Sequence, residues 1–193
     1  MHNSVMGNRD QEGSRREGGH QEGGQAPTMN RSFLIMGWIA VIGLLTLVAG
    51  QWEERQHNPN QQPITQLSVE GSREVVLQRN RYGHYVTSGL INGQEVTLLL
   101  DTGATYVSVP ENLAEKLGLI KMARGQASTA NGIVDTYLTR IERLSIGGIE
   151  VYDVVASINP GMNHDTSILL GMSVLKNIEF TQRGDQLTLR LVP

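Results

Sequence analysis

The chain has 193 residues, of which 39% are hydrophobic and 18% are charged, so it can hold one ordinary globular domain with additional segments but not two large domains. Its formal net charge is -3 and it has no basic footprint, so we expect no nucleic-acid partner. It has no cysteine, which excludes disulfides, thiolate nucleophiles and cysteine-based zinc sites. Its five histidines lack the spacing of metal ligands, so the sequence gives no support for a metal site.

Residues 1–31 are rich in Gly, Gln, Arg and Glu, and we expect them to be a disordered polar tail. The uncharged apolar run that follows, from Phe33 to Gly50, predicts a transmembrane helix over residues 32–50. The alternative is a cleaved signal peptide, for which Val48-Ala49-Gly50 is a passable cleavage pattern. The long polar segment before the apolar run favours an uncleaved anchor.

Basic residues near the apolar run set the expected orientation. Arg15, Arg16 and Arg31 precede it and Arg55 follows it, so the positive-inside rule favours a cytoplasmic N-terminus and an extracytoplasmic C-terminal domain. Residues 51–72 show no core-forming period and are predicted to be a flexible tether.

From residue 73 to 193 the chain consists of short apolar runs separated by Gly, Asn and Asp, which indicates an all-β domain. Asn92-Gly93 predicts a hairpin over residues 84–100, whose second strand leads directly to Asp101. Asn131-Gly132 and Gly147-Gly148 predict two further hairpins.

Two short helices are expected in this domain. One covers residues 110–117, with Pro110 at its first position and Gly118 just past its end, and the other covers MSVLKNI, residues 172–178. The last segment, residues 186–192, alternates apolar and polar residues and is predicted to be a strand with one buried face.

The stretch TLLLDTGATYVS, residues 97–108, ends an apolar strand on a carboxylate. An ionised carboxylate is costly to remove from water unless it is hydrogen-bonded or shares a proton, so Asp101 either caps a turn or serves chemistry. Tyr106 is interpreted as a packing residue.

Asp101-Thr102-Gly103-Ala104, a later glycine-bearing hairpin, and Ile168-Leu169-Leu170-Gly171 before a short helix occur in this order. In these three motifs and their order, the chain resembles the retropepsin-like aspartic proteases, most closely their bacterial membrane-anchored branch, over about residues 74–191. The resemblance implies an all-β fold, a closed β-barrel-type acid protease protomer with one or two short helices, here preceded by a single transmembrane helix.

Aspartic proteases activate water between two carboxylates that share one proton. The chain has one Asp-Thr-Gly, and HDTS at residues 164–167 lacks the glycine. The resemblance therefore implies a homodimer in which each subunit contributes Asp101. It implies no metal or organic cofactor. The terminal strand, residues 186–192, is expected at the dimer interface, because a terminal strand would otherwise be an open edge.

The family pattern assigns a role to each matching residue. It makes Asp101 the catalytic carboxylate, Thr102 a brace between the two catalytic loops, Gly103 a point of close approach, and Ala104 a small corner residue. The other implied positions are the substrate-binding flap tip and the support beneath the catalytic loop: Thr129, Ala130, Asn131 and Gly132 in the flap, and Ile168, Leu169, Leu170 and Gly171 in the support.

The leading hypothesis is a membrane-anchored homodimeric aspartic endopeptidase that binds an extended protein or peptide substrate. As a single-pass protein of the inner membrane, it would hold its protease domain in the periplasm. The alternative is a catalytically silent dimeric module of the same fold that binds peptides or a partner, since fold does not prove function.

Overall fold

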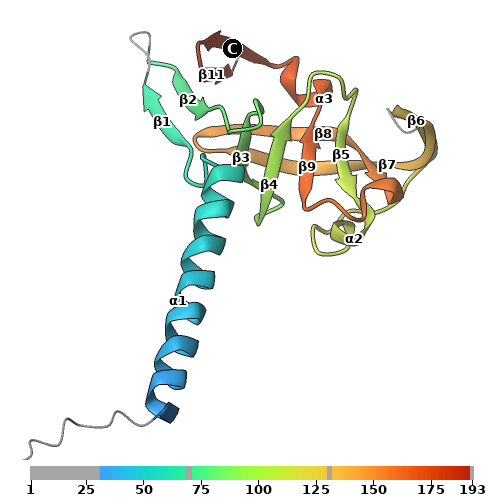
Figure 1. Ribbon diagram of the computed structural model, residues 1–193. Coiled ribbons are helices and arrows are strands. Elements are labelled where there is room, and N and C mark those ends of the chain that lie inside the picture. The colour runs from blue at the N-terminus through green and yellow to red at the C-terminus, as the bar shows by residue number, and fades with distance from the viewer. Residues whose placement is uncertain (1–30, 68–70, 130–131, 192–193) are drawn as a thin grey trace, which may run out of the picture. The chain divides into compact units, whose positions relative to one another are not determined.

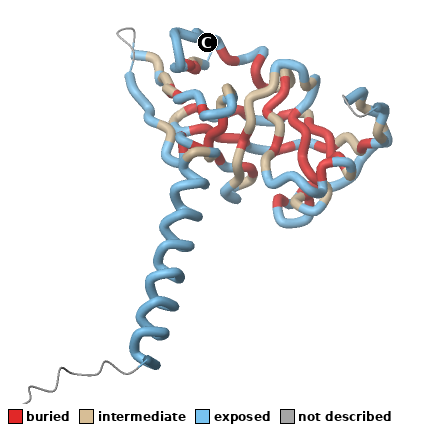
Figure 2. The backbone as a smooth tube through the Cα atoms, viewed as in Figure 1, coloured by how far each residue is buried: buried red, intermediate tan, exposed pale blue. Residues whose placement is uncertain are grey.

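The computed structural model describes residues 31–67, 71–129 and 132–191. The predicted tail up to residue 30 lies outside the described residues, as do Ala130 and Asn131 of the predicted flap. Helix α1 (Arg31–His57) has no buried residue and is long and apolar enough to cross a membrane (Figures 1 and 2). It is longer than the predicted 32–50 because the polar residues that follow are good helix formers.

The segment after α1 corrects the predicted flexible tether. Its first residues continue the helix, Asn58 and Asn60 are each only 5% exposed, and β1 (Ile64–Leu67) pairs with β2 (Arg73–Gln78). The side chain of Asn60 takes the place of a strand partner for the end of β2 and the start of β3. Its Nδ2 donates to Gln78 O at 2.8 Å and to Val86 O at 2.7 Å, and its Oδ1 accepts from Gln78 N at 2.6 Å. The polar composition of this segment therefore did not reveal the hydrogen-bonded joint that Asn60 forms with β2 and β3.

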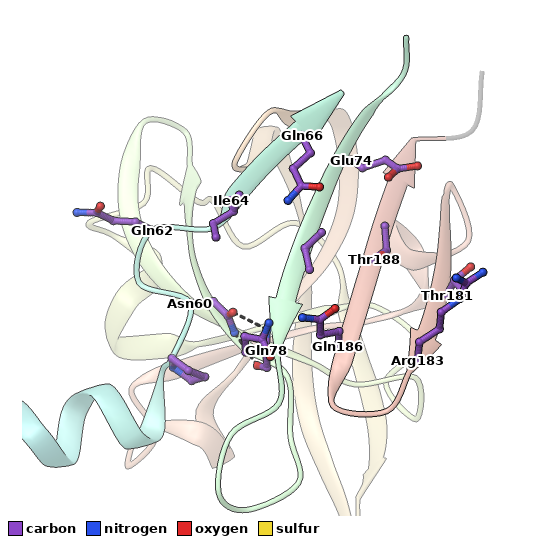
Figure 3. A pocket seen from close by; sticks show the side chains of 12 residues that line it. Asn60, Gln62, Ile64, Gln66, Glu74, Gln78, Thr181, Arg183, Gln186 and Thr188 are labelled. Atoms are coloured by element: carbon purple, nitrogen blue, oxygen red, sulfur yellow. Dashed lines mark hydrogen bonds between the residues drawn. The ribbon is translucent and has the colours of Figure 1, made fainter. Parts of the chain in front are cut away.

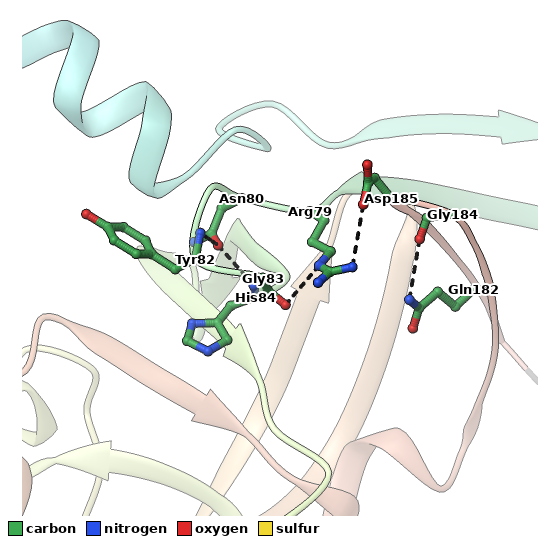
Figure 4. Close-up of polar contacts among 8 residues, drawn as sticks. All are labelled: Arg79, Asn80, Tyr82, Gly83, His84, Gln182, Gly184 and Asp185. Atoms are coloured by element: carbon green, nitrogen blue, oxygen red, sulfur yellow. Dashed lines mark hydrogen bonds and ion pairs between the residues drawn. The ribbon is translucent and has the colours of Figure 1, made fainter.

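A second buried asparagine, Asn80, ties the loop after β2 to the end of α1. Its Nδ2 donates to His57 O at 2.9 Å, while its Oδ1 accepts from the main-chain N–H groups of Tyr82 and His84 (Figure 4). Arg79 leaves the same loop to pair with Asp185. The loop is thus rigidly attached to the helix end by buried polar contacts.

Seven strands form the larger sheet, in the order β3-β4-β9-β5-β8-β7-β6. Strand β3 also pairs with β7, which closes the sheet on itself and leaves β6 as an extension. The closed all-β fold expected from the sequence is confirmed. The bounds are β3 (Val86–Ile91), β4 (Gln94–Leu100), β5 (Val107–Pro110), β6 (Arg124–Thr129), β7 (Gly132–Ile146), β8 (Ile149–Asn159) and β9 (Ser167–Leu170).

The predicted turns largely hold. Asn92 and Gly93 join β3 to β4 with φ values of 50° and 83°, as a primed hairpin turn requires, and Gly147-Gly148 joins β7 to β8. Helix α2 (Glu111–Ala114) is shorter than predicted, although Gly118 ends the following turns with the expected positive φ. A 3₁₀ turn η1 (Pro160–Met162) and helix α3 (Met172–Leu175) flank β9.

Parallel pairing of β4 with β9 places two remote segments at one edge of the barrel. Leu98 lies opposite Ile168 and Leu100 opposite Leu170, and Leu98, Ile168 and Leu170 are fully buried. Immediately beyond, Gly171 lies against the next loop, since a Cβ there would be 2.3 Å from Tyr106 O and 2.6 Å from Ala104 O. Only glycine permits this approach.

The smaller sheet, β1-β2-β11-β10, corrects the expectation for the terminal strand. Strand β11 (Gln186–Leu191) lies between β2 and β10 (Ile178–Arg183) of the same chain, so it is not an open edge. Leu187 and Leu189 face the core. The other face is polar and lines a hollow of about 560 Å³ (Figure 3). The edges of this sheet are β1 and β10.

Replacing Asn60 with alanine removes hydrogen-bond partners from buried main-chain groups of β2 and β3. Because each unsatisfied buried group costs about 1–3 kcal/mol, we expect Asn60→Ala to lower the free energy of unfolding of the domain by about 2–4 kcal/mol. Chemical denaturation followed by near-ultraviolet circular dichroism measures this. Asn177→Ala, at an exposed position, is the control. Equal free energies of unfolding for the two variants would contradict this structural role of Asn60.

Replacing Gly171 with alanine forces a Cβ against main-chain oxygens that cannot rotate away. We expect Gly171→Ala to destabilise the domain by at least about 2 kcal/mol, since overpacked sites cost roughly that much. The control is Gly125→Ala, whose added Cβ would meet its nearest neighbour at 3.5 Å, an ordinary contact. Thermal unfolding of both variants in parallel tests the expectation, and an unchanged melting temperature for Gly171→Ala would refute it.

Candidate active site

Asp101 is the first residue after β4 and begins a loop that runs to Tyr106. Its N–H donates to Leu170 O at 3.2 Å, which fixes the start of the loop on β9. Its carboxylate Oδ1 accepts from Gly103 N at 2.8 Å, and Ala104 N closes the turn on Asp101 O at 3.2 Å. The carboxylate belongs to a partly exposed residue and is held by one main-chain donor, Gly103 N–H. It is therefore oriented, yet accessible.

The residues next to Asp101 are available to a partner. Thr102 and Gly103 are exposed, and Thr102 forms no hydrogen bond within the described part of the chain. A Cβ on Gly103 would lie 3.1 Å from Asp101 Oδ1, so glycine at this position leaves room for the carboxylate. Ala104 is partly buried.

The segment after β9 holds the loop that begins at Asp101 through hydrogen bonds. Met172 N donates to Ala104 O at 2.8 Å, Ser173 N donates to Thr105 O at 2.9 Å, and Ser173 Oγ accepts from Val107 N at 3.0 Å. Of the four residues assigned to support, Ile168, Leu170 and Gly171 are buried, whereas Leu169 is half-buried and lines a cleft. Leu169 therefore differs from the predicted supporting role.

The cleft beside Asp101 has a volume of about 850 Å³. Asp101 is the only carboxylate among the described residues that line it, and no lysine, arginine or histidine lines it. The walls come from the loop of residues 101–106, β5, the β6–β7 hairpin, β8 and β9. The lining residues are Asp101, Gly103, Ala104, Thr105, Tyr106, Ser108, Gly125, Gln126, Ala127, Ser128, Thr129, Thr136, Leu138, Ser157, Asn159 and Leu169.

The β6–β7 hairpin forms one wall of this cleft, in the place expected of a flap. Thr129 lines the cleft and its Oγ1 donates to Gly132 O at 2.8 Å. Gly132 begins β7 and is not part of the lining. Most of the hairpin's contribution comes from Gly125 to Ser128, which the sequence analysis did not select.

Other residues that line the cleft were also not predicted from the sequence to belong to a site. Tyr106 is 40% exposed and lines the cleft, so its interpretation as a packing residue is wrong. Ser108, Ser157 and Asn159 belong to two strands that are separated along the chain by about fifty residues and become neighbours only through parallel pairing. The one local signal was a serine or asparagine within an otherwise apolar strand.

The comparisons with known proteins agree with this geometry. Residues 87–177 match the sequence model of a family described as "gag-polyprotein putative aspartyl protease". A curated protein of Sinorhizobium sp, described as "Uncharacterized protein in cobV 5'region", is 36% identical over 125 residues, which cover 63% of this chain and 53% of that protein. The chain thus spans about half the length of this relative.

Two solved structures are similar to this chain, and the first of them supports the fold. The crystal structure of a retropepsin-like aspartic protease from Rickettsia conorii matches with 28% identity and a TM-score of 0.50, over 60% of this chain and 98% of that chain. A protease of EIAV in complex with an inhibitor matches with 21% identity and a TM-score of 0.42, over 50% and 89% of the two chains. The domain that follows helix α1 therefore has the fold of the retropepsin-like aspartic proteases and is similar to them in sequence.

Proposed function

We propose that the protein is an aspartic endopeptidase that is active as a homodimer, with one Asp101 from each subunit. The observation that carries the proposal is the oriented carboxylate of Asp101 in a cleft where no other described lining residue is an acid. One carboxylate cannot act as both base and acid toward the same water, so a second copy must supply the other.

In the proposed dimer, the two carboxylates lie too close for both to ionise and share one proton. The ionised carboxylate accepts a proton from water as it attacks the peptide carbonyl, and the protonated one donates to the carbonyl oxygen. The Gly103 N–H, which donates to Asp101 Oδ1, would hold the carboxylate plane during this exchange. The exposed Thr102 is available to bond with the partner's loop.

The substrate of the proposed enzyme is an extended peptide. The cleft is lined by strands on its floor and by the edge of the β6–β7 hairpin, and an extended segment satisfies such an edge through main-chain hydrogen bonds. The alternative function is a catalytically silent module that binds peptides in the same cleft. Retention of Asp101 with its Thr-Gly-Ala neighbours favours the enzyme, because binding alone has no need of an acid.

We also propose that α1 anchors the protein in the inner membrane, within the stretch 32–50, behind a polar tail of residues 1–31, and that the protease domain is periplasmic. Exposed Trp52 and three arginines, Arg55, Arg79 and Arg81, line one shallow pocket at the C-terminal end of the helix. Aromatic and basic side chains of this kind favour the membrane–water interface. The folded domain would begin at Asn58.

Asp101→Asn tests the chemistry. An amide cannot share the proton that primes the water, so we expect peptide hydrolysis to fall by at least about 10³-fold while the fold is kept. Activity is measured on full-length protein in detergent micelles with a peptide library, over a range of pH. Hydrolysis at the wild-type rate would show that Asp101 is not catalytic.

Mixing tests the shared site. If subunits exchange freely and both Asp101 carboxylates are needed, equal amounts of wild-type and Asp101→Asn subunits should leave about a quarter of the activity of an all-wild-type sample at the same total concentration. A sample that keeps half of the activity would show that each subunit works alone.

A reporter fused after Pro193 tests the orientation. We expect a reporter that requires an extracytoplasmic, oxidising compartment to be active and a cytoplasmic reporter to be inactive, because the arginines before α1 favour a cytoplasmic N-terminus. Basic side chains lie at both ends of the helix, so this experiment decides the orientation. The opposite pattern of reporter activity would place the domain in the cytoplasm.

A further inference from the structure

The floor of the cleft is a single row of side chains across four adjacent strands. Ser108 of β5 lies opposite Leu169 of β9 on one side and Ser157 of β8 on the other, and Ser157 lies opposite Leu138 of β7. All four residues line the cleft. The row therefore has two leucines at its ends and two serines at its centre.

The polar centre extends along the strands. Side chains two residues apart share a face of a sheet, so Asn159 follows Ser157 and Thr136 precedes Leu138 on the same cleft face. Ser157, Asn159 and Thr136 are 7%, 5% and 3% exposed, and all three line the cleft. Hydrogen-bonding side chains thus form the deepest part of the cleft.

These polar groups have unused hydrogen-bonding capacity. Asn159 Oδ1 accepts from Gly161 N at 2.9 Å, but its Nδ2 has no partner within the described residues. The side chains of Ser157 and Thr136 likewise form no hydrogen bond there, and Ser108 Oγ bonds only to Met162 Sδ, a weak acceptor, at 3.3 Å. Asn159 Nδ2, Ser157 Oγ and Thr136 Oγ1 have no partner and are not sealed from solvent, so these three atoms remain accessible.

We propose that Ser108, Ser157 and Asn159 form a polar subsite that selects a carboxamide side chain, glutamine or asparagine, in the bound peptide. This inference rests on the proposed binding of peptides in the cleft. The amide oxygen accepts from Asn159 Nδ2, the amide NH₂ donates to the serine hydroxyls, and the methylene stem contacts the flanking Leu138 and Leu169.

The single negative charge and the hydrogen-bonding groups of the cleft disfavour the competing side chains. A glutamate would bring a second negative charge toward Asp101 where no cation lines the cleft. An ammonium group would find N–H donors of Asn159 facing it. A methionine or leucine of similar length would leave the floor's polar groups without partners, which weakens binding. The carboxamide alone satisfies donors and acceptors without a charge.

The test uses full-length protein in detergent micelles and a peptide library whose cleavage sites are read by mass spectrometry. Around the preferred site, three peptides then carry Gln, Glu or Met at the selective position. We expect kcat/KM for the Gln peptide to exceed that of the other two at least about tenfold, a factor within the range expected for one unpaired group.

Substitutions in the subsite test whether it causes the preference for Gln. Asn159→Asp keeps the acceptor for Gly161 N–H and removes the donors, so it should abolish the preference for Gln over Met, and Ser157→Ala should weaken it. Thr181→Val, on the outer face of the smaller sheet and outside the cleft, is the control and should change nothing. A library that selects apolar side chains at every position, or an Asn159→Asp variant with unchanged selectivity, overturns the subsite and leaves the proposed protease intact.

Binding separates the two proposals. Fluorescence anisotropy of the three peptides with the Asp101→Asn variant measures selectivity without turnover. Where no cleavage site is found, the three peptides carry Gln, Glu or Met within the library sequence that this variant binds most tightly. If no peptide is cleaved by the wild-type protein but Gln binds at least about tenfold more tightly than Met, the protease proposal fails and the subsite stands. Equal affinities for Gln and Met overturn the subsite whether or not cleavage occurs.

Discussion

The parallel pairing of β4 with β9 is the constraint on which the site depends. It brings residues that are seventy positions apart to one edge of the barrel, where Asp101 N–H donates to Leu170 O and the next residue of β9 is Gly171. Leu98, Ile168 and Leu170 bury this pairing completely. The position of the carboxylate is therefore set by the core.

Close contact between main-chain segments at this edge explains the glycine at position 171. The loop of residues 101–106 rests directly on the main chain at Gly171, and α3 donates N–H groups to its carbonyls. A loop held through main-chain atoms leaves its side chains free for other contacts. Thr102 and Asp101 can thus face outward without loss of order, which suits a site completed by a second copy.

The same sheet that buries the core also builds the cleft. On one face, β5, β8 and β9 contribute fully buried aliphatic residues, and on the other they contribute Ser108, Ser157, Asn159 and Leu169. At the opposite end of the domain, polar residues have a purely structural task, since Asn60 and Asn80 attach β2, β3 and the end of α1 to one another. All three asparagines are buried, so unused hydrogen-bonding capacity, rather than residue type or burial, distinguishes Asn159 from Asn60 and Asn80.

The sequence by itself determined the features that depend on local pattern. The apolar run of α1, the Asn92-Gly93 hairpin, the all-β class and the loop that begins at Asp101 each follow from neighbouring residues. Tertiary structure decided what depends on pairing between distant strands: the order of residues across the cleft floor, the internal position of β11, and the joint at Asn60 in place of a tether. The physical reason is that a residue's neighbours within its own strand set its face, whereas hydrogen bonds to other strands set which residues share that face, and those bonds leave no periodic trace in the sequence.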